Sequence, residues 1–126
     1  MVKLLIDSLD KYDERTVEEV LAIKSEDEEK ITYTYSSELG ENTINIFKDF
    51  SVEIIRKGQV ESYQMLKEGE NTKFLYKTPY FLGNFEIRTE KVKYEEKKLT
   101  ICYFIYDNDI EMNKLTIEIK ELDNKI

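Results

Sequence analysis

The side chains that could do chemistry here are tyrosines, carboxylates and amines, because the chain has no histidine and one cysteine. Without histidine, His-based catalytic triads, the usual general base near neutral pH, and most zinc or iron sites are excluded. Cys102 has no imidazole or second thiol beside it in sequence, so we interpret it as a buried structural thiol. The carboxylates of residues 26–29 and 107–109 lie in predicted turns, where solvation explains them. We expect no catalytic residue, metal ligand or cofactor, and predict that the protein is not an enzyme; catalysis through paired carboxylates, or through tyrosine and lysine, is a reserve hypothesis.

Tyrosine is the remaining chemical feature, with nine copies in the chain. Five of them lie on or beside predicted strands whose faces should turn inward in a barrel: Tyr33, Tyr35, Tyr76, Tyr80 and Tyr103. In one interpretation the rings pack in the core and the hydroxyls bond to neighbouring backbone. In the other they line a pocket for a small amphipathic ligand, since a barrel of about eight strands is just wide enough for one. Arg56 either supplies a charge at the mouth of that pocket or is a solvated residue at the end of its strand.

Strands must position these side chains, because apolar and polar residues alternate along most of the chain. The predicted strands cover residues 2–6, 31–36, 43–47, 50–55, 60–67, 74–78, 85–89, 99–106 and 115–119. Turn signals recur about every ten residues, which is typical of an all-β sandwich or barrel. We predict one domain, residues 1–126, folded as an antiparallel up-and-down β-barrel. Its core should include Phe85, Ile101, Tyr103 and Ile117.

Two stretches are harder to interpret. Residues 16–26 fit a helix, with a capping-box spacing at Thr16 and Glu19, and fit a strand equally well. The only proline, Pro79, should mark a corner between two strands, because proline cannot donate to a sheet ladder. Gly83 and Asn84 are expected to complete that bend.

Charge and hydropathy limit the partners and the compartment. The net charge is −8, whereas nucleic acids and anionic membranes reward clustered lysine and arginine. No apolar run approaches the roughly 18 residues of a membrane span. The N-terminal residues reach an acidic residue too soon for a signal sequence. We therefore expect a cytoplasmic protein that binds neither nucleic acid nor membrane.

The strand at residues 99–106 is apolar on both faces, which suggests a function for the outer surface. Ile101 and Tyr103 should face inward, leaving Cys102, Phe104 and Tyr106 on the outside. Large apolar side chains on an outer face need cover. Either the N-terminal segment packs over them, or two copies of the chain form a twofold homodimer. An interaction module that acts through its outer surface is thus the alternative to a ligand-binding barrel.

Several short motifs resemble a known family. In order along the chain they are R-x-G (Arg56, Gly58), a strand with Met65 followed by Gly69, Y-x-T-P-Y (residues 76–80), a strand ending in Thr89, and I-x-Y (Ile101, Tyr103). Together they resemble the YwiB-like bacterial family of unknown function, most specifically at Y-x-T-P-Y. The resemblance implies a calycin-like barrel of the lipocalin and streptavidin type, and it favours strand for residues 16–24. It implies no activity, ligand or catalytic residue. Phe81 and Leu82 are inserted relative to the family pattern, so this corner should protrude more than in relatives.

Overall fold

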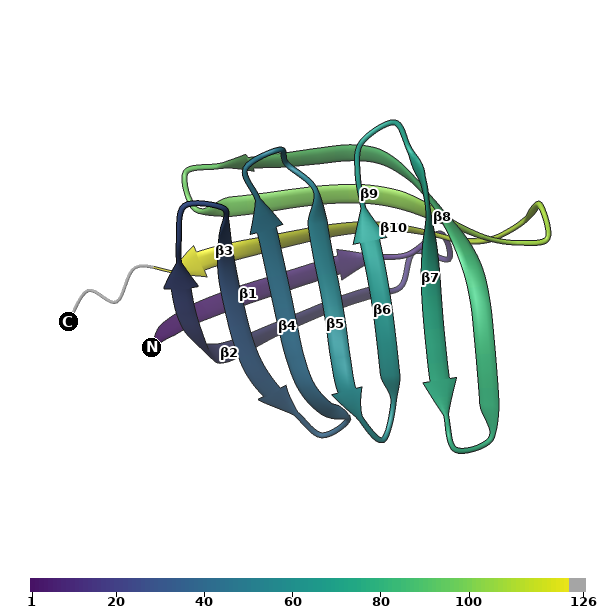
Figure 1. Ribbon diagram of the computed structural model, residues 1–126, viewed down its shortest axis with the longest axis horizontal. Helices are drawn as coiled ribbons and strands as arrows, with labels where there is room; N and C mark the ends of the chain where they lie inside the picture. Colours follow the sequence, from purple (N-terminus) through teal and green to yellow (C-terminus); the bar gives the residue numbers. More distant parts are fainter. Residues whose placement is uncertain (123–126) are drawn as a thin grey trace.

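The structure, a computed structural model, describes residues 1–122, which form ten antiparallel strands closed into a barrel (Figure 1). The strands are β1 (Val2–Leu9), β2 (Arg15–Glu26), β3 (Lys30–Ser37), β4 (Gly40–Phe47), β5 (Val52–Gly58), β6 (Glu61–Leu66), β7 (Asn71–Thr78), β8 (Phe81–Glu95), β9 (Lys98–Asp107) and β10 (Ile110–Leu122). Each strand pairs with the next in sequence, and β1 also pairs with β10. The predicted all-β up-and-down barrel is confirmed, with ten strands rather than about eight.

Two long strands, β2 and β8, turn the corners between the two sides of the barrel. Residues 15–22 of β2 pair with β1, whereas residues 23–26 pair with β3. In β8, residues 81–88 pair with β7 and residues 86–95 pair with β9, across a bulge that helps the strand to bend. As a result β3–β7 run across β1, β9 and β10, and the barrel has two crossing layers (Figure 1).

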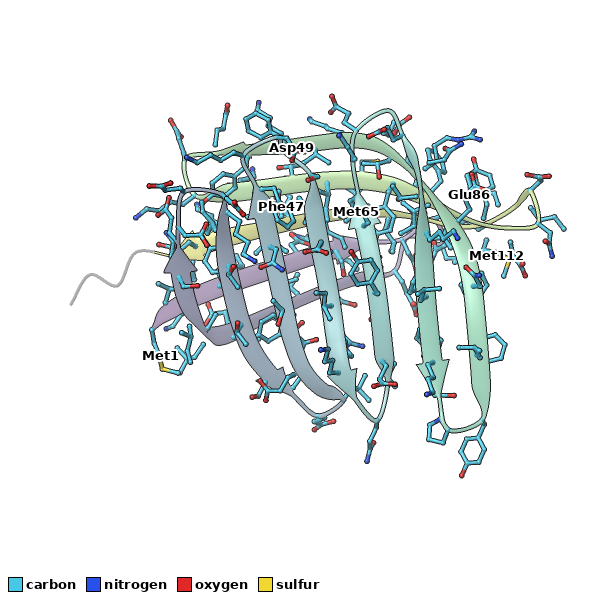
Figure 2. The ribbon with its side chains drawn as sticks, viewed as in Figure 1. Met1, Phe47, Asp49, Met65, Glu86 and Met112 are labelled. Carbon is cyan, nitrogen blue, oxygen red and sulfur yellow. The ribbon has the colours of Figure 1, made fainter. Side chains whose placement is uncertain are left out.

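The same two strands leave one end of the barrel less tightly joined. Within the described chain, residues 15–22 of β2 have no ladder partner on the side of β3, and residues 81–85 of β8 have none on the side of β9. Both stretches lie at the end that carries the β1–β2, β3–β4, β5–β6, β7–β8 and β9–β10 turns. We call this the open end, and the opposite end the closed end. The β9–β10 hairpin at the open end projects beyond the rest of the barrel (Figure 1), and Met112 on it is exposed (Figure 2).

The structure decides both ambiguous stretches. Residues 16–26 belong to a strand, in agreement with the family resemblance. Pro79 lies in the short turn between β7 and β8 as predicted, but Gly83 and Asn84 do not complete the bend: they lie in β8, opposite Tyr76 and Leu75.

The position of Gly83 has a packing reason. A Cβ atom on Gly83 would lie 2.5 Å from the ring of Phe85 and 2.8 Å from that of Phe81. The two rings fold over the glycine backbone from neighbouring inward positions, so a side chain at residue 83 would displace them.

A second pair of glycines makes a close approach between β4 and β5. Gly40 lies opposite Gly58, and a Cβ atom on Gly40 would lie 2.3 Å from the carbonyl oxygen of Lys57. Gly40 also has a φ of +142°, which L-residues with a side chain rarely adopt. The β3–β4 hairpin therefore requires glycine at residue 40.

The outer face of β9 is covered by neighbouring side chains of the same sheet. The Lys114 amine lies 5.0 Å from the centre of the Phe104 ring, and the Arg88 guanidinium lies 5.1 Å from that of Tyr106. Both rings are half-buried as a result. The N-terminal segment does not cover them, because it forms β1 in the barrel wall, so the hypothesis of an N-terminal lid is wrong.

No helix of residues 1–122 has the length and apolar character needed to cross a membrane.

Candidate functional site

Inward-facing side chains become more exposed from the closed end to the open end. Toward the closed end the buried core includes Ile46, Val52, Leu66, Val92, Leu99, Ile101 and Ile119. Toward the open end the apolar side chains on the same inward faces are only half-buried: Ile6, Ile54, Phe74, Ile105, Leu115 and Ile117. Solvent therefore reaches the interior from the open end, where β2 and β8 lack their second neighbours. The core prediction is correct for Ile101 and Tyr103 and too strong for Phe85 and Ile117, which are half-buried.

Arg56 is the cation on this half-buried interior. It alternates with Val52 and Ile54 along β5, and it lies opposite Asn42 of β4 and Ser62 of β6. Its Nε atom donates a hydrogen bond of 3.0 Å to the side-chain oxygen of Asn42. Among residues 1–122, no carboxylate forms an ion pair with Arg56. Arg56 is thus an inward-facing residue and not a solvated strand end.

Asn42 holds Arg56 in place and is itself held by the β3–β4 hairpin. Its side chain is 4% exposed. The amide nitrogen donates to the Oγ atom of Ser37 at 2.9 Å, and to the backbone oxygens of Gly40 at 3.3 Å and Tyr35 at 3.4 Å. With its nitrogen bound to the hairpin, the side-chain oxygen of Asn42 is fixed in position to accept from Arg56. Asn42 was not among the residues predicted from the sequence, although it continues the inward alternation of Ile44 and Ile46.

An apolar pocket of about 310 Å³ lies at the open end across β5, β6, β7 and the start of β8. We call it the β5–β8 pocket, and it is lined by Ile55, Arg56, Lys57, Glu61, Ser62, Tyr63, Leu75, Tyr76, Lys77 and Leu82. Ile55, Tyr63 and Leu75 lie opposite one another on three successive strands. These three side chains face outward, so the pocket lies on the outer face of the barrel. Arg56 and Tyr76, two of the predicted site residues, also line it, but their side chains alternate with this wall and face the interior.

Tyr35 and Tyr76 are both half-buried and inward-facing at the open end. Tyr76 packs between Phe74, with ring centres 6.1 Å apart, and Phe81, with ring centres 6.4 Å apart. Tyr35 lies opposite Asn42 on β3. Burial raises the pKa of the Tyr35 hydroxyl, the charge of Glu18 raises it further, and Arg56 lowers it. The predicted residues Tyr35, Arg56 and Tyr76 therefore lie at the same end of the barrel.

Tyr33 and Tyr103 lie elsewhere and have structural partners. Tyr103 is 1% exposed and donates a hydrogen bond of 2.8 Å to the Gln64 side-chain oxygen across the core. Tyr33 is buried at the closed end, where it donates to Glu121 Oε1 at 2.8 Å. Burial raises the pKa of both hydroxyls, which stay protonated as donors. The core-packing interpretation fits these two tyrosines.

Tyr80 lies outside the barrel. It is 97% exposed in the β7–β8 turn, and its backbone nitrogen donates to the Thr78 hydroxyl. Its ring does not line the β5–β8 pocket. The next residues in the chain, Phe81 and Leu82, are also exposed.

The closed end holds an ionic cluster that was not predicted from the sequence. Glu121 faces inward from β10, and its Oε1 atom lies 2.9 Å from the Lys24 amine while its Oε2 atom lies 3.6 Å from that of Lys97. The Tyr33 hydroxyl also bonds to Glu121, and the Tyr94 hydroxyl oxygen lies 3.5 Å from that of Tyr33. Every member of this cluster has a partner, as expected for a structural plug.

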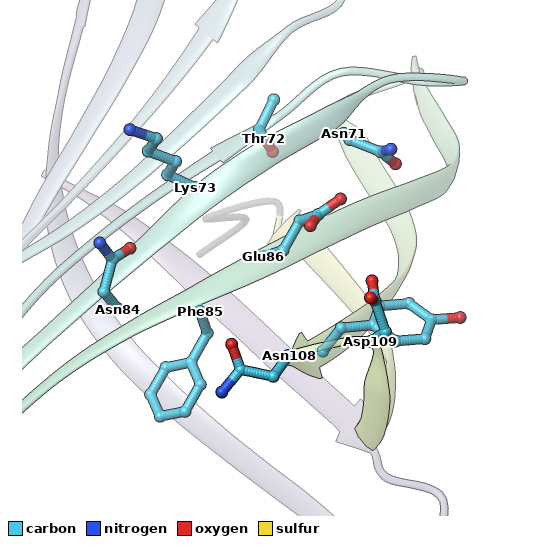
Figure 3. Close-up of a pocket in the computed structure, with 9 residues that line it drawn as sticks. Asn71, Thr72, Lys73, Asn84, Phe85, Glu86, Asn108 and Asp109 are labelled. Carbon is cyan, nitrogen blue, oxygen red and sulfur yellow. The ribbon is translucent and has the colours of Figure 1, made fainter.

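A second pocket, of about 470 Å³, lies beside the β9–β10 turn and is mostly polar (Figure 3). Its lining residues are Asn71, Thr72, Lys73, Asn84, Phe85, Glu86, Tyr106, Asn108 and Asp109. Lys73 lies opposite Glu86 on the ladder. No predicted site residue lines this pocket.

Within residues 1–122 no cluster of three or more His, Cys, Asp and Glu side chains is placed to hold a metal.

Comparison with known proteins identifies the family and the fold. The model of a family described as a domain of unknown function (DUF1934) matches residues 8–119. The crystal structure of the ywiB protein from Bacillus subtilis aligns with 97% of this chain and 92% of its own, at a TM-score of 0.76 and 18% sequence identity. No curated protein matches the chain. The resemblance noted in the sequence is confirmed, and at this identity the solved structure supports the fold alone.

Proposed function

Because the chain belongs to the DUF1934 family, whose description assigns no activity, we propose from its own geometry that it binds a small amphipathic molecule in the β5–β8 pocket. The observation that carries this proposal is an apolar pocket of ligand size on the outer face of the barrel, over β5, β6, β7 and the start of β8 near the open end. Ligand pockets in proteins are commonly apolar concavities with a few convergent polar groups, and start at about 300 Å³.

The lining suits a molecule with an apolar body and a polar head. Ile55, Tyr63 and Leu75 offer adjacent apolar surface from three strands, and Leu82 of β8 adds to it. Leu75 is 45% exposed and Leu82 is 75% exposed, so both would lose apolar surface to water when a ligand binds. Lys57, Glu61 and Lys77 supply polar groups at the edge of this surface.

A neutral fluorescent amphiphile, N-phenyl-1-naphthylamine, tests the pocket independently of charge. Leu75→Ser should weaken its binding, measured by fluorescence titration, by about three- to tenfold, since Leu75 is 45% exposed and burying the exposed half of a leucine side chain contributes about 0.7–1.5 kcal/mol. Leu9→Ser is the matched control, because Leu9 of β1 is a similarly exposed leucine, at 41% against 45%, and does not line the pocket. No binding by the wild type, or equal losses in the two variants, would exclude a ligand site in this pocket. Native mass spectrometry of the freshly purified protein would show a molecule that co-purifies.

A second candidate function, association of two copies of the chain, rests on the outer face of β2. Val17, Leu21 and Ile23 form a row on this face and are 52%, 57% and 61% exposed. Leu5 of β1 lies on the same face. A twofold axis through the row would bury it against its own copy. Sedimentation equilibrium should then give a dimer that Leu21→Glu dissociates without unfolding the barrel; a wild-type monomer would exclude this association.

A further inference from the structure

We infer that the edge of β2 at the open end binds an extended segment of a partner protein, which adds an antiparallel strand to the barrel. We call residues 15–21 of β2, on the side away from β1, the free edge. The partner segment has apolar side chains on its inner face and a basic side chain opposite Glu19. The site is separate from the β5–β8 pocket, which lies on the outer face of other strands, so this inference does not depend on a ligand there.

A hydrogen bond at the β1–β2 turn shows which backbone groups point to the free edge. The Asp10 N–H donates to the Glu14 oxygen at 3.0 Å. Bonded pairs recur at every second residue of an antiparallel ladder, so the even-numbered residues of β2 bond to β1. The residues left with both backbone groups on the free edge are Arg15, Val17, Glu19 and Leu21.

The opposite end of β2 gives the same assignment. The Asp27 N–H donates to the Lys30 oxygen at 3.0 Å in the β2–β3 turn. Counting back from Asp27 in steps of two gives the odd-numbered residues of β2, but β3 pairs only with residues 23–26. No backbone group from a turn or loop of residues 1–122 bonds to the free edge either. Four N–H and four C=O groups are thus available to an added strand.

The free edge borders an interior face that is only partly covered. At their open ends β3–β7 extend past β2, so the layer that contains β2 stops short of covering them (Figure 1). The inward-facing Tyr35 and Tyr76 on these strands are half-buried, and Glu18, which faces inward from β2 itself, is exposed. Packed β-layers lie about 10 Å apart, so a strand added to β2 would lie at packing distance from this face. Its inward side chains would meet the two tyrosine rings, which favours apolar residues there.

The arrangement favours a single extended segment over a second copy of the chain. If two copies paired through β2 about a twofold axis, the open ends of β3–β7 of both copies would enter the same space (Figure 1). A lone extended segment brings no second layer and can enter beside β2. Strand addition to an exposed sheet edge is an established mode of peptide recognition, in which main-chain hydrogen bonds supply affinity.

Charge specifies the outer side of the partner segment. On the outer face of β2, the Arg15 guanidinium lies 2.6 Å from the Asp7 carboxylate, whereas Glu19 forms no ion pair within residues 1–122. Opposite charges on directly paired strands are favourable, and like charges are unfavourable. A lysine or arginine opposite Glu19 is therefore favoured, and the net charge of −8 attracts a basic segment as well.

A short peptide with these properties, acetyl-Thr-Leu-Lys-Phe-Lys-Leu-Thr-amide, tests the free edge. In antiparallel pairing, the peptide residues with outward side chains are those whose N–H groups point to β2. N-methylation of both lysines therefore removes donors to β2, whereas N-methylation of both leucines alters nitrogens that point away and is the matched control. In isothermal titration calorimetry the lysine-methylated peptide should bind at least about tenfold more weakly than the unmodified one, and the leucine-methylated peptide within about threefold of it.

Val17→Pro tests the edge from the side of the protein. The Val17 N–H has no ladder partner, so proline removes an edge donor without breaking the ladder to β1. It should weaken binding of the unmodified peptide by at least about tenfold, whereas Val17→Ala keeps the N–H and should weaken it by less than about threefold. Glu19→Gln should weaken it a few-fold, because the opposite charge is lost. If circular dichroism shows that Val17→Pro is poorly folded, the methylated peptides still decide.

Amide hydrogen exchange measured by NMR shows where the peptide binds. Without peptide, the amides of Val17, Glu19 and Leu21 should exchange faster than those of their even-numbered neighbours, and the peptide should protect them. No binding of the unmodified peptide, equal or reversed effects of the two methylations, or equal effects of Val17→Pro and Val17→Ala would overturn the inference. Protection of these amides without peptide, in a protein that sediments as a dimer, would overturn it in favour of a second copy.

Discussion

Tyr33→Phe should destabilise the barrel because Tyr33 is a structural member of the closed end. Its hydroxyl donates to Glu121 Oε1 at 2.8 Å, and the same oxygen lies 2.9 Å from the Lys24 amine. The Tyr33 ring is buried, and the Glu121 side chain is 9% exposed. Phenylalanine preserves the ring and its packing, so the substitution removes one charge-assisted hydrogen bond and little else.

The magnitude follows from that single bond. A hydrogen bond to a charged group contributes about 1.5–3 kcal/mol, and here Lys24 continues to neutralise the carboxylate after the hydroxyl is lost. We therefore expect the free energy of unfolding to fall by about 2 kcal/mol at pH 7. For a domain of this size that corresponds to a Tm lowered by roughly 5–10 °C.

The effect should also depend on pH. Burial raises the pKa of Glu121, but hydrogen bonds from Lys24 and Tyr33 outweigh it, so the pKa lies below its usual value of 4.5. A carboxyl group with a lowered folded-state pKa contributes stability above its unfolded-state pKa and loses it as the pH falls through the folded-state value. The difference between the wild type and Tyr33→Phe should therefore be largest near neutral pH and shrink below about pH 4.5.

Urea unfolding followed by far-ultraviolet circular dichroism, at pH 7 and at pH 3.5, measures both effects. Tyr80→Phe is the control, because Tyr80 is 97% exposed and its substitution should change the free energy of unfolding by less than about 0.5 kcal/mol. Equal, small effects of the two substitutions at pH 7 would refute the structural role of the Tyr33 hydroxyl. A loss that is the same at both pH values would refute its coupling to Glu121.

Three other substitutions test the packing and the hairpin backbone. Ile101→Ala removes a fully buried side chain and should lower the free energy of unfolding by about 2–5 kcal/mol. Phe85→Ala should lower it by less than the roughly 3–5 kcal/mol typical of a buried phenylalanine, because Phe85 is half-buried. Equal losses in the two variants would show that Phe85 lies in a closed core. Gly40→Ala should lower the free energy of unfolding by at least about 2 kcal/mol, since the residue has a positive φ and its Cβ atom would meet the backbone of Lys57. If urea unfolding showed a variant as stable as the wild type, the hairpin would have to adopt another conformation.

The strands were predictable because alternation along the chain is a local property that survives folding. Val52, Ile54 and Arg56 share one face by alternation alone, and the structure places all three inward. Residues 16–26 were ambiguous because Val17, Leu21 and Ile23 face outward and are exposed. An apolar outer row combined with inward Lys24 obscures the two-residue period that a strand with one buried face would show.

The candidate site was only partly predictable. Alternation separates inward from outward side chains, but it does not show how burial changes along the barrel axis. Tyr33 and Tyr35 are two residues apart on one face, yet Tyr33 is buried at the closed end and Tyr35 is half-buried toward the open end. The difference arises where residues 15–22 of β2 lose contact with β3, a consequence of how distant strands pair. The pocket itself depends on outward residues of β5, β6 and β7, which the inward-looking prediction did not consider.

The two ends of the barrel hold inward charge in different ways. At the closed end the Glu121 carboxylate is matched by two lysines and a tyrosine hydroxyl, so its charge needs no further partner. At the open end the Arg56 cation is oriented by the neutral amide of Asn42 and forms no ion pair with a carboxylate of residues 1–122. The inward cation is thus held by a hydrogen bond to a neutral amide, whereas the inward carboxylate is held by two ion pairs and a hydrogen bond.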